Sequence, residues 1–120
     1  MRRVSKKRAK IERKLEPFLD AYRAEFPACQ ICYMVPATDI HELCRGKDRL
    51  KARHERALIM HVCRECHDYI QNESFGRQLA AKLLSNSGYD LAKFLEVKGW
   101  QPGFIEQGEV EAVARRMRFE

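Results

Sequence analysis

At 120 residues the chain is long enough for one modest hydrophobic core and too short for two ordinary domains. Its formal net charge of +6 favours an anionic partner. No stretch approaches the roughly 18 to 20 apolar residues of a transmembrane helix, and the basic start lacks the apolar segment of a secretory signal. We therefore expect a cytoplasmic protein that does not bind membranes.

Most of the positive charge lies at the N-terminus. Residues 1–14 contain eight lysines and arginines and a single acidic residue, which gives this segment a net charge of +7 and leaves −1 for the rest of the chain. The segment is interpreted as a basic arm, which is either a solvated tail or an arm that contacts phosphates. Pro17 then suits the first turn of a helix, and Pro27 ends it. The apolar residues at helical spacing in this helix are Phe18, Leu19, Tyr22 and Phe26.

Short β-prone pieces follow, and then helical patterns. Two apolar pieces, 31–35 and 57–62, are predicted as strands, and a charged loop that contains Gly46 separates them. Helices are expected over 64–72, from a cap at Ser74 to about residue 85, over 91–97 and over 106–117. The chain thus divides into the basic arm 1–14, a core with its preceding helix over 15–73, and a helical extension over 74–120.

Four of the five cysteines form two C-x-x-C pairs that are thirty residues apart. The pairs are Cys29 with Cys32 and Cys63 with Cys66. In a reducing compartment this spacing favours a metal site over disulfides, and four thiolates close a tetrahedral Zn²⁺ shell of the structural kind. Two unrelated cysteine pairs are one alternative. A Cys₃His shell that uses Cys44 or His61 is another.

The motifs around these cysteines follow one another in a recognisable order. They read Cys29-x-x-Cys32, Asp39-Ile40-His41-Glu42-Leu43, Arg45-Gly46 and Cys63-x-x-Cys66-His67. This order resembles the zinc-containing branch of the HNH endonucleases, which includes small phage and prophage proteins. The resemblance implies a small α+β fold in which a ββα-metal, treble-clef-like core is stapled by zinc and flanked by helices. It also implies a metal-dependent DNA endonuclease or nickase in the cytosol of a bacterium or of a phage-infected host.

Matched position by position, His41 falls on the family's metal ligand in the first strand and Glu42 on its general base. His67 falls on the metal ligand that begins the helix. The resemblance thus implies that His41, Glu42 and His67 are catalytic, and that the two histidines hold a catalytic Mg²⁺, Mn²⁺ or Ni²⁺ ion besides the structural Zn²⁺. Glu42 stands where the family has a His, and Leu58 where it has its middle Asn. Asp39 or Glu42 is a candidate carboxylate helper, because strand alternation puts Asp39 on the same face as His41.

These departures leave a second interpretation open. In it, the chain is a catalytically inactive zinc-finger protein that binds DNA or RNA, or an adaptor for a larger nucleic-acid-processing protein. The loop after Glu42 suits both interpretations, because its basic residues alternate and, in an extended chain, point the same way at intervals of about 6 to 7 Å. These residues are Arg45, Lys47, Arg49, Lys51 and Arg53. A mobile, solvated loop is the alternative.

Overall fold

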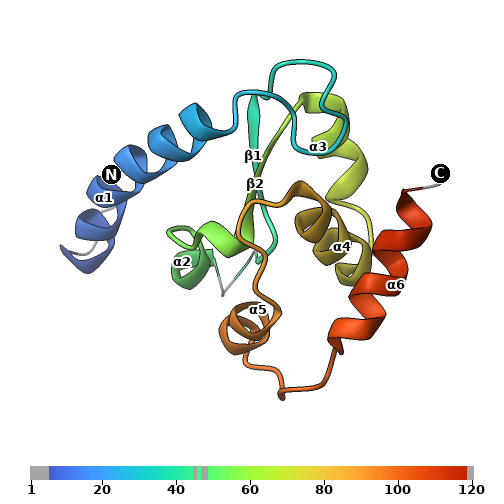
Figure 1. Cartoon of the computed structure of the whole chain (residues 1–120). Coiled ribbons are helices and arrows are strands. Elements are labelled where there is room, and N and C mark those ends of the chain that lie inside the picture. The colour runs from blue at the N-terminus through green and yellow to red at the C-terminus, as the bar shows by residue number, and fades with distance from the viewer. Residues whose placement is uncertain (1–5, 45, 47–48, 119–120) are drawn as a thin grey trace.

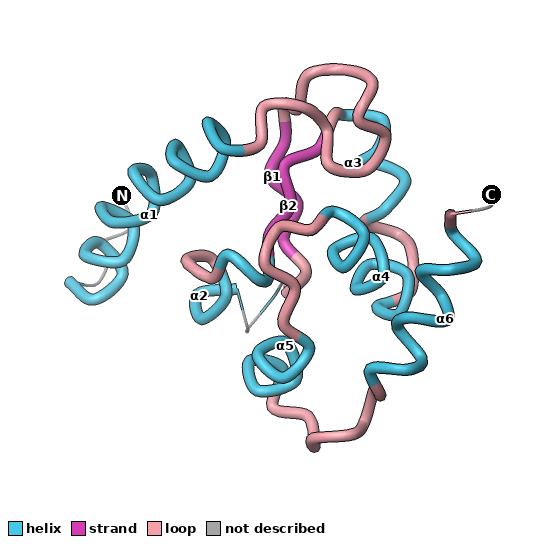
Figure 2. The backbone as a smooth tube through the Cα atoms, in the orientation of Figure 1, coloured by secondary structure: helices cyan, strands magenta, loops and turns pink. Residues whose placement is uncertain are grey.

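The computed structural model describes residues 6–44, 46 and 49–118, and it shows a small α+β protein built around a two-stranded sheet (Figure 1). The strands β1 (Asp39–Glu42) and β2 (Ile59–Val62) are antiparallel, with Asp39 opposite Val62 and Glu42 opposite Ile59. The helices are α1 (Lys6–Glu25), α2 (Arg49–Ala52), α3 (Arg64–Ile70), α4 (Phe75–Ser85), α5 (Leu91–Lys98) and α6 (Gln107–Met117). Figure 2 shows α1 and α2 to one side of the hairpin and α3, α4 and α6 to the other.

The four predicted helices after residue 63 are confirmed, and their ends follow the expected capping chemistry. The Ser74 hydroxyl accepts a hydrogen bond from the backbone N–H of Arg77 at 3.3 Å and begins α4. The Asp90 carboxylate does the same for Lys93 at 3.0 Å and begins α5. Gly99, with φ of 71°, ends α5 in the left-handed conformation. Each helix in the described part of the chain is either too short or too polar to span a membrane.

The predicted strand over 31–35 is wrong, whereas the one over 57–62 is confirmed in its second half. Residues 30–32 form a turn, in which the backbone N–H groups of Ile31 and Cys32 both point at the Cys29 sulfur, 3.5 Å away. A C-x-x-C pair that turns both sulfurs to one side cannot remain extended, so the first strand forms further along the chain, at Asp39–Glu42. Residues 56–58 form a short 3₁₀ turn before β2.

The prediction that the first helix begins near Pro17 is also wrong. Helix α1 begins at Lys6 and carries Pro17 in its interior. Leu15, Leu19 and Tyr22 are buried on one face, which anchors the helix to the rest of the protein. The preceding residues are mostly Lys, Arg, Glu and Ala, which favour helix and continue it in the N-terminal direction. The backbone of residues 6–14 is therefore helical rather than an extended arm.

A buried lysine joins α1, β2 and α4. Lys82 has no exposed surface, and its Nζ lies within hydrogen-bond distance of oxygen atoms from several elements. These are the carbonyls of Arg56 (2.8 Å), Ile59 (2.8 Å) and Ser87 (3.1 Å), the Ser87 hydroxyl (2.8 Å) and the Tyr22 hydroxyl (3.2 Å). No carboxylate stands among these partners. Burial, and then the charge of Arg56, lower the pKa of Lys82 to about 7.

We expect Lys82→Met to lower the free energy of unfolding by about 1 to 3 kcal/mol, because the buried carbonyls of Arg56 and Ser87 lose their donor. The comparison is made by urea denaturation at several pH values. An unfolded lysine titrates near 10.5 and Lys82 near 7, so the unfolded chain binds more protons between these values. The wild-type stability therefore rises with pH relative to Lys82→Met, by at most about 1.4 kcal/mol per pH unit.

Lys93→Met is the matched control, because Lys93 is a surface lysine whose Nζ lies 3.5 Å from Glu55 and 3.8 Å from Glu96. The free energy of unfolding of Lys93→Met should change with pH in the same way as that of the wild type. If the Lys82→Met curve runs parallel to the wild-type curve from pH 7 to 10, Lys82 does not titrate in this window.

Candidate functional site

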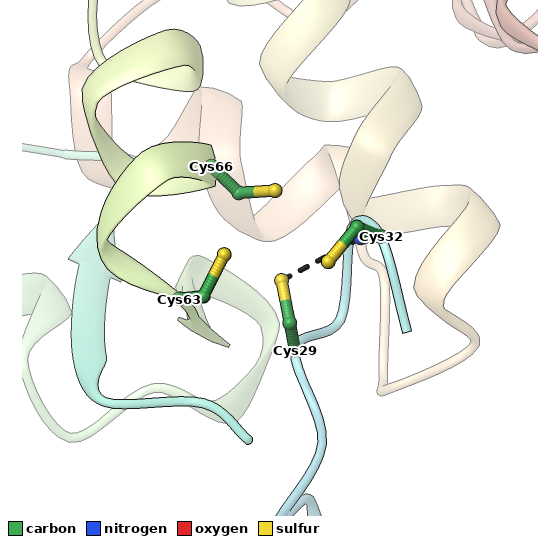
Figure 3. Close-up of side chains that lie close together, drawn as sticks. All are labelled: Cys29, Cys32, Cys63 and Cys66. Carbon is green, nitrogen blue, oxygen red and sulfur yellow. Dashed lines mark hydrogen bonds between the residues drawn. The ribbon is translucent and has the colours of Figure 1, made fainter. Parts of the chain in front are cut away.

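The structure gathers the four cysteines of the C-x-x-C pairs into one cluster. Two of them flank the turn before β1, and the other two lie at the N-terminus of α3. Figure 3 shows the four sulfurs turned toward a common centre, and all four lie within 4.8 Å of one another. This is the one group of three or more His, Cys, Asp or Glu side chains in the described residues that is close enough to share an ion.

The geometry and chemistry of the cluster fit a metal ion. Sulfurs in a tetrahedral zinc shell lie about 3.8 Å apart, which is compatible with four sulfurs that all lie within 4.8 Å of one another. Burial opposes ionisation of Cys29, but backbone N–H groups of Cys32, Cys63 and Ile31 lower its pKa to about 6. Burial and hydrogen bonds to Cys63 and Cys29 raise the pKa of Cys66. Because four thiolates this close repel one another, a divalent cation is what lets all four ionise. The cluster could therefore hold a structural metal such as zinc.

The two other residues considered for this shell lie elsewhere. Cys44 is fully buried in the main hydrophobic core. His61 places its Nδ1 2.7 Å from the carbonyl of Phe26. Neither belongs to the cluster, so the donor set of the described residues is four sulfurs.

A second group of side chains forms where α3 crosses β1. The rings of His41 and His67 meet edge to face, with centroids 5.4 Å apart. The Nδ1 atom of His67 lies 2.9 Å from the Asp39 carboxylate, which also accepts hydrogen bonds from Arg64 (3.1 Å) and Thr38 (2.9 Å). The hydrogen bond from His67, followed by that from Thr38, holds the pKa of Asp39 at about 2, so this carboxylate is ionised at neutral pH.

His41 contacts Gln78 on α4, a residue that the sequence analysis does not single out. Its ring is 1% exposed, and its Nε2 lies 2.7 Å from Oε1 of Gln78 on α4. Gln78 in turn donates from Nε2 to the carbonyl of Glu73 at 2.9 Å, which fixes the orientation of its amide. No local sequence motif predicts the contact between His41 and Gln78, because these residues are 37 positions apart.

Glu42 and His67 open onto the same cavity, which has a volume of about 580 Å³. The Glu42 carboxylate lies 2.8 Å from Nε of Arg49 and 3.7 Å from Nε of Arg53. The lining residues are Glu16, Leu19, Arg23, Ile40, Glu42, Gly46, Arg49, Arg53, His67 and Gln71. Three arginines, from α1, α2 and the turn after α2, therefore share the cavity with two carboxylates and one imidazole. Arg49 and Arg53 pair with Glu42, whereas Arg23 lies 3.8 Å from Glu16.

The basic loop is only partly described. Arg45 and Lys47 lie outside the described residues, and residues 49–52, which include Lys51, form the helix α2. The alternation expected of an extended chain is therefore not present from residue 49 onward. Arg49 and Arg53 instead lie one helical turn apart and meet at Glu42, because a spacing of four residues puts them on one face.

No family model, curated protein or solved structure gives a significant match to this chain. The cysteine cluster and the His67 cavity are therefore interpreted from their own residues. His41 and His67 do not form, with a third described His, Cys, Asp or Glu, a group close enough to share an ion.

Purified wild-type protein should contain one zinc per chain, and Cys63→Ser should lose it. Metal content is measured by mass spectrometry after gel filtration, and stability by thermal unfolding with and without a chelator. Because a metal bound only by the folded chain stabilises it, both the substitution and the chelator should lower the melting temperature.

Cys44→Ala is the control, because it removes a buried thiol outside the cluster. It should keep its metal even if the core is weakened. Full zinc content in Cys63→Ser would contradict the proposed ligand set.

Proposed function

We propose that the protein is an HNH-like, divalent-metal-dependent DNA endonuclease or nickase, with a ββα-metal, treble-clef-like core held by a structural zinc. The observation that carries this proposal is the position of His67. It directly follows a cysteine of the cluster, is oriented by Asp39 at 2.9 Å, and opens onto a cavity lined with arginines. An oriented imidazole beside clustered guanidinium groups suits chemistry at a phosphate.

His67 and Asp39 form the reactive pair in this proposal. With Nδ1 donating to Asp39, the Nε2 atom of His67 carries the lone pair, and His67 lines the cavity in which the substrate would lie. His41 is the second imidazole, and Gln78 fixes its ring. His41 and His67 would hold the divalent ion, which would supply charge stabilisation at the scissile phosphate and the leaving oxygen.

The arginines bind the substrate, and Glu42 competes with it for them. Arg49 and Arg53 neutralise Glu42 in the free protein. A phosphate offers the same guanidinium groups a better match, since they bind its oxygens in pairs. Binding of the backbone thereby releases the Glu42 carboxylate, which can then accept a proton from water. In this scheme the base becomes available only when the substrate is in place.

The same ion pairs support the second candidate function, a zinc-stapled protein that binds nucleic acid without cleaving it. Glu42 is held by two arginines, and the ring of His41 is almost fully buried. If neither group is released on binding, the cavity retains its phosphate contacts and lacks a base. The protein would then serve as an adaptor for a larger nucleic-acid-processing protein.

His67→Ala should abolish nicking or linearisation of supercoiled plasmid in Mg²⁺, Mn²⁺ or Ni²⁺, and should leave the zinc content of the protein unchanged. The control is His54→Ala, which removes a histidine that packs against Phe18 at 5.9 Å, outside the cavity. His54→Ala should cleave like the wild type. A zinc-loaded wild-type protein that retards DNA in a gel and cleaves it in none of these metals would establish the second candidate.

Arg49→Gln/Arg53→Gln should weaken DNA binding whether or not the protein is an enzyme. The loss of two phosphate contacts should make the negative slope of log K against log [salt] shallower by about 2, as measured by fluorescence anisotropy at 50 to 200 mM salt. Arg115→Gln/Arg116→Gln on α6 is the matched control, because it removes the same charge from residues that do not line this cavity. Equal effects of both double substitutions would mean that only net charge matters.

A further inference from the structure

An apolar groove lies between α5, the loop that follows it and the start of α6. Its volume is about 560 Å³. The lining residues are Leu91, Ala92, Leu95, Glu96, Trp100, Pro102, Gly103, Ile105, Glu106 and Gln107. In Figure 1 the α5–α6 loop is far from α3, whose N-terminus carries two of the clustered cysteines. The groove shares no lining residue with the His67 cavity and contains none of the four cysteines, so it is a separate site.

The groove is preformed rather than collapsed. Leu95 is 5% exposed and anchors its floor in the main core. Trp100 is held by ring contacts with Phe75 at 5.5 Å and Phe94 at 5.8 Å. Phe104, whose ring lies 5.2 Å from that of Trp100, is 66% exposed and extends the apolar surface past the groove. Large apolar side chains held open to solvent in this way indicate a binding surface.

The charge around the groove is acidic, in contrast to the chain as a whole. Glu96 and Glu106 are exposed in its lining, which contains no lysine or arginine. Two lysines flank the groove on the α5 side: Lys93 lies 3.8 Å from Glu96, and the Lys98 ammonium lies 5.1 Å from the centre of the Trp100 ring. Residues 89–113 contain five acidic residues and two lysines, a net charge of −3 in a chain of +6. Such a surface repels nucleic acid and attracts cationic groups.

We propose that this groove docks a segment of another protein that combines an apolar anchor, such as Leu or Phe, with flanking Lys or Arg residues. The anchor would enter between Leu91 and Trp100, and its basic neighbours would pair with Glu96 and Glu106. The volume is within the range of about 300 to 1,000 Å³ usual for ligand pockets, and acidic residues at the rim select the charge of the occupant. This inference is independent of whether the His67 cavity cleaves DNA.

The test uses three synthetic peptides of equal length, titrated into the full-length protein. One is an amphipathic helix of Leu and Lys, one replaces every Lys with Glu, and one scrambles the Leu and Lys order to destroy the apolar face. Trp100 is the only tryptophan in the chain, so its fluorescence reports directly on the groove. Amide chemical shifts identify the residues affected. The Leu–Lys helix should bind at least tenfold more tightly than the other two and shift the amides of residues 91–107.

Two variants challenge the proposal without touching the core. Ala92→Arg places a long cationic side chain at an exposed lining position and should weaken the Leu–Lys peptide at least tenfold. Glu96→Lys/Glu106→Lys should reverse the preference toward the Leu–Glu peptide. The matched control is Glu65→Lys/Asp68→Lys, which reverses two exposed charges on α3 and should leave the preference unchanged.

Three results would overturn the proposal. One is binding of the scrambled peptide as tight as that of the helix. Another is a DNA duplex producing the same Trp100 change, which would make the groove a nucleic-acid site. The third is a Trp100 change with protein concentration alone, together with dimers in sedimentation velocity, which would assign the groove to a second copy of this chain.

Discussion

The fold around the His67 cavity depends on the four cysteine sulfur atoms, which lie within 4.8 Å of one another. Thirty residues separate the second cysteine of the first pair from the first cysteine of the second pair, and an ion held by both pairs closes that segment into a loop. The segment contains both strands of the sheet and half of the residues that line the His67 cavity. The free energy of binding such an ion would offset the entropy cost of closing this loop on folding. The sheet is only two strands of four residues each, so it needs this support.

The cluster also fixes the direction of one side chain. Cys63 and Cys66 begin α3, and His67 is the next residue, so any ion held by the cysteines sets where the imidazole points. Asp39, in β1, then fixes the rotation of the His67 ring through a hydrogen bond of 2.9 Å. An ion held there and the strand would together position His67 from two independent sides. The proposed nuclease would need such support, because the geometry of its imidazole must survive the arrival of a charged substrate.

Local chemistry made part of the structure predictable. The C-x-x-C spacing predicts the cysteine cluster. Ser74, Asp90 and Gly99 mark helix ends, because capping depends on a few neighbouring residues. Failures occurred where a distant contact or a stronger local requirement decided the outcome. Residues 31–35 have the composition of a strand, yet the turn at the first cysteine pair excludes it. A proline usually lies in the first turn of a helix, yet Pro17 lies inside α1, because the buried residues on both sides of it keep the helix continuous.

Long-range polar contacts were the least predictable. Lys82 lies in an amphipathic helix, where a lysine normally faces water, and only the fold shows that five oxygen atoms of the described residues surround its ammonium group. The contact between Gln78 and His41 is of the same kind. Sequence patterns report which face of a helix is apolar. They do not report which polar group on a distant element will meet it.

Pro17 gives α1 a built-in weak point. A proline inside a helix cannot donate to the carbonyl four residues earlier, here that of Arg13, and its ring crowds the same carbonyl. Pro17 lies between Leu15 and Leu19, which are both buried in the same cluster. Contacts on both sides of Pro17 therefore hold α1 in place, and the packing compensates for the local stability that the proline removes. Loss of the Leu15 contact would leave the turns before Pro17 without support from either the core or the proline.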